Sequence, residues 1–177
     1  KELDTGLSAW NLAMGSQELY DWLDAEPQLF HPGDLDYIHS VERISKLSNV
    51  ISINGGVQLD LMGQENAEST GTRQLSGVGG QMDFLEGAYR SKGGKGFICI
   101  NSSRVTKNGE RKSNILATIP GGSTISAPRT MIQYVATEYG IASLSGKTLR
   151  ERAEAMASIA HPDFREELMK YAQENFK

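Results

Sequence analysis

Residues 76–101 read SGVGGQMDFLEGAYRSKGGKGFICIN, and this stretch decides the fold class. The glycines of Gly77–Gly80 come directly before the run Gln81 to Tyr89, whose apolar residues have helical spacing. A second glycine pair, Gly93-Gly94, follows that run, and the apolar residues after it predict a strand from Gly96 to Asn101. The stretch therefore predicts a loop, a helix, a second loop and a strand, in that order.

The same alternation continues on both sides of this stretch. Before it, apolar residues with a period of two from Val50 to Leu61 predict one strand, or two strands interrupted at Gly55-Gly56. After it, Asn108-Gly109 predicts a hairpin turn, and Thr148 with Glu151 predicts a capping box at a helix start. The other predicted elements are helices at Leu19–Leu23, Ile38–Leu47 and Pro162 to about Phe176, a polar loop over 63–78, and strands at Tyr134–Ala136 and Ile115–Ala117. Such alternation predicts one α/β domain over residues 1–177, with a layered sheet and flanking helices.

The composition fits one domain and disfavours two kinds of partner. The 177 residues include 18 Lys and Arg against 22 Asp and Glu, a net charge of −4, which disfavours nucleic-acid binding by phosphate neutralisation. No apolar run reaches the roughly 18 residues of a membrane span, and the N-terminus lacks a signal-peptide core. The 19 glycines exceed the usual share of ~7%, which indicates tight turns or backbone close to a ligand.

The single cysteine, Cys99, lies in the apolar run Phe97–Ile100 and has no second cysteine to pair with. We expect a buried thiol in a strand rather than a nucleophile, because no His lies near it in sequence. A reducing, soluble compartment, the cytoplasm, is the expected location. The chain begins without Met, so we expect it to be a piece of a longer protein.

The glycines of Gly77–Gly80 have two readings. Glycines at a helix start leave backbone N–H groups unobstructed, which suits a phosphate, a carboxylate or a developing oxyanion. The alternative is a tight turn that packs the helix against the sheet. Spacing alone leaves both readings open.

Two other motifs indicate structure more than chemistry. Gly140 to Thr148 resembles a Walker A loop, but five residues instead of four separate Gly140 from Gly146, so we expect a loop and a helix cap. Arg90 to Lys95 places cations around flexible backbone, where they could meet phosphates or simply face solvent. The histidines lack the spacing of a zinc site, so no metal is expected; they are His31, His39 and His161.

A series of short motifs runs in order from near residue 10 to near residue 170. They are Ala13–Asp21, Ile51–Asn54, Leu59–Ser69, Gly77–Phe84, Ser91–Lys95, Thr137–Ala142 and Gly146–Arg165. Together they resemble the C-terminal domain of the acetyl-CoA hydrolase/transferase family, particularly its 4-hydroxybutyrate CoA-transferase-like members. The resemblance implies a CoA-transferase-like fold, of the NagB/RpiA/CoA-transferase type.

The resemblance also implies a reaction in which CoA moves between carboxylic acids. In such enzymes a glutamate attacks the acyl-CoA, and a glutamyl-CoA thioester then passes CoA to the acceptor carboxylate. That glutamate belongs to a His-Ser/Thr-Glu-Met type motif which lies before the part of the family matched here, so this chain has no candidate nucleophile. CoA and acyl-CoA are then substrates, and no tightly bound cofactor is expected.

The resemblance assigns roles to a few positions. Gly80, with Gly79 beside it, matches the glycine whose amide binds the thioester oxyanion. The positions matching CoA-binding residues are Val57, Ser76, Gly80 and Lys92. His39 stands where many relatives have Asn, and the Asp-Pro that follows in relatives is Ser40-Val41 here, which leaves the acceptor acid open.

Three functions remain open at this stage. CoA transfer is the leading hypothesis, with an N-terminal domain that completes the pocket and a small carboxylic acid as second substrate. Hydrolysis of acyl-CoA, in which water resolves the thioester, is the second. A non-catalytic module that binds CoA or a nucleotide is the third, because the nucleophile motif is absent beside an intact glycine loop. A homo-oligomer is also possible.

Overall fold

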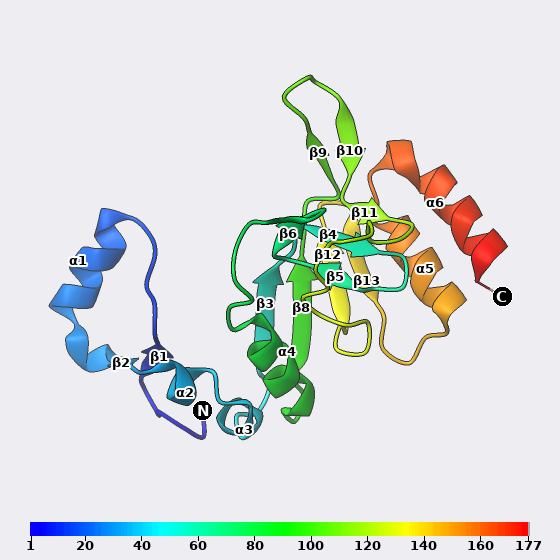
Figure 1. Cartoon of the computed structure of the whole chain (residues 1–177). Helices are drawn as coiled ribbons and strands as arrows, with labels where there is room; N and C mark the ends of the chain where they lie inside the picture. The colour runs from blue at the N-terminus through cyan, green and yellow to red at the C-terminus, as the bar shows by residue number, and fades with distance from the viewer. Residues whose placement is uncertain (177) are drawn as a thin grey trace.

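The computed structural model describes residues 1–176 and confirms the α/β class, with a layered arrangement of strands and helices (Figure 1). The helices are α1 (Gln17–Ala25), η1 (Pro27–Leu29, a 3-10 turn), α2 (Leu35–Ile38), α3 (Val41–Ser45), α4 (Gln81–Arg90), α5 (Leu149–Ser158) and α6 (Pro162–Asn175). The strands are β1 (Ser8–Trp10), β2 (Phe30–Pro32), β3 (Ile51–Gly55), β4 (Gln58–Asp60), β5 (Glu65–Asn66), β6 (Ser69–Thr70), β7 (Arg73–Gln74), β8 (Lys95–Cys99), β9 (Ser103–Val105), β10 (Arg111–Ser113), β11 (Ile115–Leu116), β12 (Tyr134–Thr137) and β13 (Gly140–Ser143).

The largest sheet has four strands in the order β13-β12-β8-β3. Strands β3, β8 and β12 are parallel, and β13 returns antiparallel to β12. Because α4 lies between β3 and β8 in the chain and packs on both, its first turn lies toward the carboxyl ends of these strands. Ligands of open parallel sheets commonly bind at those ends, so the fold places the glycines of Gly77–Gly80 near the edge of the sheet where a ligand is expected.

One face of this sheet is covered. Ile98, Val135 and Ala142 point from it into a core formed with Leu85 of α4 and Met156 of α5, and all five are 3% exposed or less. A smaller sheet, β11-β4-β5, closes the same core with further buried apolar residues.

The other face is largely bare. Ile51, Ile53 and Ile141 are 50%, 69% and 63% exposed, and Phe97 stacks on Tyr134 with ring centroids 4.9 Å apart. We call these five residues the bare face. Parallel sheets normally have both faces covered, so this exposed apolar surface is unusual for such a sheet.

The N-terminal segment stands apart from the sheet (Figure 1). Helix α1 begins at Ser16, whose side chain accepts a hydrogen bond from the amide of Leu19, yet α1 has no buried residue. Trp22 of α1 is 48% exposed and contacts Phe30 edge to face. This segment also leaves apolar side chains uncovered.

Local sequence signals were reliable for caps and turns. Thr148 and Glu151 form the capping box, and the side chain of His161 caps α6. The break at Gly55-Gly56 gives two strands, β3 and β4. The predicted helix over 38–47 is instead two short helices, because Ser40 caps a new helix directly after α2.

Other predictions need correction. The hairpin turn at Asn108-Gly109 is confirmed, but it joins β9 to β10, rather than the predicted strands Gly96–Asn101 and Ile115–Ala117. The polar region over 63–78 is not only a loop, since it includes the short strands β5, β6 and β7.

The prediction of a buried thiol at Cys99 is wrong, because Cys99 is exposed. It ends β8 on the side away from the core, so the apolar run around it buries Ile98 and Ile100 instead. No helix within residues 1–176 is both long enough and apolar enough to cross a membrane.

Candidate functional site

The loop Gly77–Gly80, which we call the open loop, enters α4 without a side-chain cap. Gly79 has a φ of +61°, a left-handed conformation that favours glycine, and Gly80 is the N-cap residue. A Cβ at Gly77 or Gly79 would meet no atom within 4 Å. Within residues 1–176, the amides of Gly79 and Gly80 donate no backbone hydrogen bond. These amides are therefore available to a ligand, at the positive end of a ten-residue helix.

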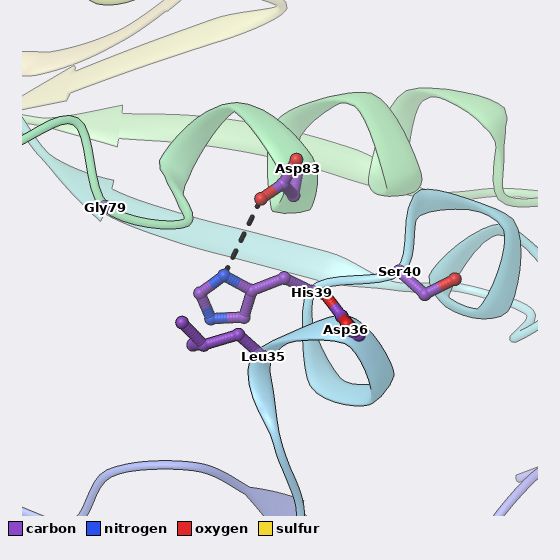
Figure 2. A pocket seen from close by; sticks show the side chains of 6 residues that line it. All are labelled: Leu35, Asp36, His39, Ser40, Gly79 and Asp83. Carbon is purple, nitrogen blue, oxygen red and sulfur yellow. Dashed lines mark ion pairs between the residues drawn. The ribbon is translucent and has the colours of Figure 1, made fainter.

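His39 packs directly against Gly80. A Cβ on residue 80 would overlap the imidazole ring, so only glycine fits there. The ring is held by three neighbours: its Nδ1 lies 3.6 Å from Oδ2 of Asp83, its Nε2 lies 3.2 Å from Nδ2 of Asn11, and its face meets Phe84 edge-on. Figure 2 shows the His39 ring between Leu35 and Asp83, with the His39–Asp83 pair dashed.

The open loop and His39 line a cavity of about 490 Å³. Its lining residues are Leu35, Asp36, His39, Ser40, Gly79 and Asp83. Two carboxylates make it unfavourable for a phosphate, whose charge they repel. A neutral carbonyl oxygen that becomes an oxyanion only during reaction suits the free amides better.

A buried carboxyl group lies beneath the open loop. Glu65 of β5 is fully buried, and its Oε2 accepts a hydrogen bond of 2.8 Å from Nε2 of Gln81, the first residue of α4. Burial, helped by the nearby charge of Glu68 and opposed by the hydrogen bond from Gln81, raises the pKa of Glu65 from 4.5 to about 7. No local pattern predicts that Glu65 is buried beneath the open loop, because it lies in a polar stretch that predicts a loop.

The proposed CoA-binding residues lie in different places. Ser76 is exposed beside the open loop, and its hydroxyl donates to the carbonyl of Gly77. Val57 is half-buried between β3 and β4. Lys92 is exposed after the C-terminus of α4, so the helix, about 15 Å long, separates it from Gly80. Only a long ligand could touch both Lys92 and Gly80.

A second depression opens at the carboxyl ends of β3, β8 and β12. It has a volume of about 430 Å³, and its lining residues are Gly56, Cys99, Ile100, Asn101, Ala136 and Thr137. Val57 directly follows Gly56, which is one of these lining residues. The position of this depression on a parallel sheet is typical of a ligand site.

The Walker-like segment forms the predicted helix cap at Thr148, but it is not only a loop, since Gly140–Ser143 form strand β13. Thr148 caps α5 together with Glu151, so the amides of these two residues already have hydrogen-bond acceptors. Among residues 1–176, no group of three or more His, Cys, Asp or Glu side chains is placed to hold a metal ion.

Several known proteins are similar to this chain in sequence and fold. The family model for the acetyl-CoA hydrolase/transferase C-terminal domain matches residues 15–172. Butyryl-CoA:acetate CoA-transferase from Anaerostipes caccae is 43% identical over 98% of this chain, and 4-hydroxybutyrate coenzyme A transferase from Clostridium kluyveri is 44% identical over 99%. The crystal structure of RipA from Yersinia pestis superposes with a TM-score of 0.86, at 39% identity over 98% of this chain.

The matching region is a minor part of each of these proteins. The chain spans 39% of the length of the Anaerostipes protein, 40% of the Clostridium protein and 38% of the RipA chain. More than half of each relative therefore has no counterpart in these 177 residues.

Proposed function

The chain belongs to the acetyl-CoA hydrolase/transferase family, as its C-terminal domain, and from this we propose that it forms one wall of the active site of a CoA-transferase. The reaction exchanges CoA between an acyl-CoA and a small carboxylic acid. A glutamate from the part of the polypeptide that precedes this domain attacks the thioester carbon and displaces CoA thiolate, which leaves an acyl-glutamyl anhydride. The thiolate then attacks the glutamyl carbonyl carbon and releases the donor carboxylate, so that CoA is held as a glutamyl thioester. This domain contributes the groups that stabilise the negative charge on the thioester oxygen.

The free amides of Gly79 and Gly80 are the observation that supports this proposal most. A thioester carbonyl seated on them gains hydrogen bonds as its oxygen becomes negative, and the enzyme does not reorganise to provide them. His39 packs beside these amides, and its two ring nitrogens face Asp83 and Asn11, so the ring helps to hold the loop in place.

The bare face supports a pocket shared with the rest of the polypeptide. Relatives are more than twice as long as this chain, and the attacking glutamate is supplied from outside it. We propose that the preceding domain covers the apolar residues of the bare face and places the glutamate opposite the open loop. Val57, Ser76 and Lys92 then contact CoA, and Lys92 is far enough from Gly80 to meet the distal end of the molecule.

Assay of the full-length enzyme distinguishes transfer from hydrolysis. With butyryl-CoA as donor, we expect CoA to be transferred to added acetate, and little free CoA to form without it. Free CoA released at the same rate with and without acetate would favour the hydrolase. No reaction at all, with CoA still bound, would favour a non-catalytic module. A cytoplasmic location and a homo-oligomer remain part of the proposal.

A further inference from the structure

Glu65 and Gln81 connect the core to the open loop, although neither faces the cavity. Glu65 lies on β5, whose backbone pairs with β4 and with Ala127, so its main chain is fixed on both sides. Its Oε2 accepts the 2.8 Å hydrogen bond from Gln81. Gln81 directly follows Gly80, so this contact fixes the residue at which the loop becomes helix.

The other oxygen of Glu65 is buried and has no hydrogen-bond partner within residues 1–176. It lies against Gly56 and Ile98: a Cβ on Gly56 would come within 3.0 Å of Oε1 and 3.1 Å of the Ile98 side chain. A carboxylate there would be an uncompensated buried charge, which is costly. A neutral carboxyl group tolerates such a place far better.

The charged groups near Glu65 would not compensate the negative charge of its carboxylate. The ionisable side chains on the elements packed around it are Asp60 on β4, Glu68 after β5, Asp83 and Glu86 on α4, Lys95 and Cys99 on β8, and Arg129 after the bridge at Ala127. Lys95 is at the opposite end of β8, and Arg129 is exposed and contacts Met62. Glu68 has the same sign as Glu65 and opposes its ionisation.

We propose that Glu65 is a positioning residue for the oxyanion amides, and that it acts in its protonated form through Gln81. This inference rests on the proposed function of the open loop. The neutral carboxyl holds the Gln81 side chain and with it the first turn of α4. Ionised Glu65 would place a negative charge beneath the amides that must stabilise an oxyanion, and so would weaken them. The raised pKa, about 7, puts this change within the working range of an enzyme.

The kinetic test compares Glu65→Ala with Glu65→Gln in the full-length enzyme. Glutamine keeps an oxygen that accepts from Gln81 and is neutral at every pH. We expect kcat of the wild type to fall above pH 7, and we expect Glu65→Gln to retain kcat without this fall. We expect Glu65→Ala to lower kcat about tenfold at all pH values, because a tenfold change corresponds to the free energy of one buried hydrogen bond. Equal pH profiles for wild type and Glu65→Gln would overturn the role of protonation.

Two further variants separate positioning from general destabilisation. Gln81→Ala should lower kcat as much as Glu65→Ala, and the double variant should lose no more than either, because both remove the same contact. Glu68→Gln is the matched control, since Glu68 is another buried glutamate but bonds to Gln74 instead of Gln81. It should retain the alkaline fall in kcat, with a midpoint at lower pH, because the charge of Glu68 no longer opposes the ionisation of Glu65. Additive losses in the double variant would overturn the proposal.

Hydrogen exchange tests the same contact without any assay of CoA transfer. In the full-length protein, peptides that cover residues 77–84 should exchange several-fold faster in Glu65→Ala than in the wild type or Glu65→Gln. Peptides that cover residues 92–99 should not change. Unchanged exchange at 77–84 would overturn the role of Glu65 even if the enzyme transfers CoA. Faster exchange in an inactive enzyme would instead show that the contact is real and the proposed function is wrong.

Discussion

The two glycine-rich loops at the ends of α4 use glycine for opposite purposes. In the open loop, a Cβ at Gly77 or Gly79 would meet nothing within 4 Å, and the amides are free. In the loop Lys92–Gly94, which we call the packed loop, a Cβ on Gly93 would overlap Oδ1 of Asn49, and one on Gly94 would overlap the carbonyl oxygen of Ala88. The open loop leaves room for a ligand, whereas the protein itself fills the space at the packed loop. Glycine content alone cannot tell these two cases apart.

The largest expected effect is on turnover, at the open loop. Gly80→Val in the full-length enzyme should lower kcat by about 100-fold, because its side chain must displace His39 and shift the amides. A steady-state assay of CoA transfer measures this change in kcat. Gly121→Ala is the control, since a Cβ there meets nothing within 4 Å. A kcat within threefold of the wild type would remove Gly80 from the site.

The next effect is on stability, at the packed loop. Gly94→Ala should lower the free energy of unfolding by about 2–3 kcal/mol, because its Cβ meets a backbone carbonyl that cannot move away. Urea denaturation, again with Gly121→Ala as control, measures the change. A loss of less than about 0.5 kcal/mol in the free energy of unfolding would mean that the packed loop has as much free space as the open loop.

A pH-dependent effect should follow from Glu65, beneath the open loop. Because its pKa rises from 4.5 to about 7 on folding, the folded state binds a proton more tightly than the unfolded state. This stabilisation is fully present below pH 4.5 and is lost as the pH rises to about 7. Between pH 5 and 8, the free energy of unfolding should fall by roughly 2 kcal/mol less in Glu65→Gln than in the wild type. Parallel curves for the two proteins would show that Glu65 is ionised throughout.

The smallest effect is expected at Lys92. If it contacts a distal phosphate of CoA, Lys92→Ala should raise KM for acyl-CoA about threefold and leave kcat unchanged, as for an exposed ion pair. Lys107→Ala, on the exposed hairpin, is the matched control. A large loss of kcat would place Lys92 in the chemistry instead.

The sequence predicted those features that depend on neighbouring residues. The α/β class, the capping box at Thr148, and the glycines before α4 all follow from local spacing and turn chemistry. The contacts that shape the site join segments far apart in sequence: His39 fills the space at Gly80, and Glu65 reaches Gln81. The exposure of Cys99 likewise depends on which face of the sheet the helices cover. No local pattern encodes that choice.

The central claim is that the amides of Gly79 and Gly80 bind the thioester oxygen, and a crystal structure of the full-length enzyme with a trapped acyl-CoA or glutamyl-CoA thioester tests it most directly. We predict the thioester oxygen at about 3 Å from the amide nitrogen of Gly80, with the ring of His39 beside it. A thioester oxygen bound elsewhere, with the open loop facing only solvent, would contradict this account.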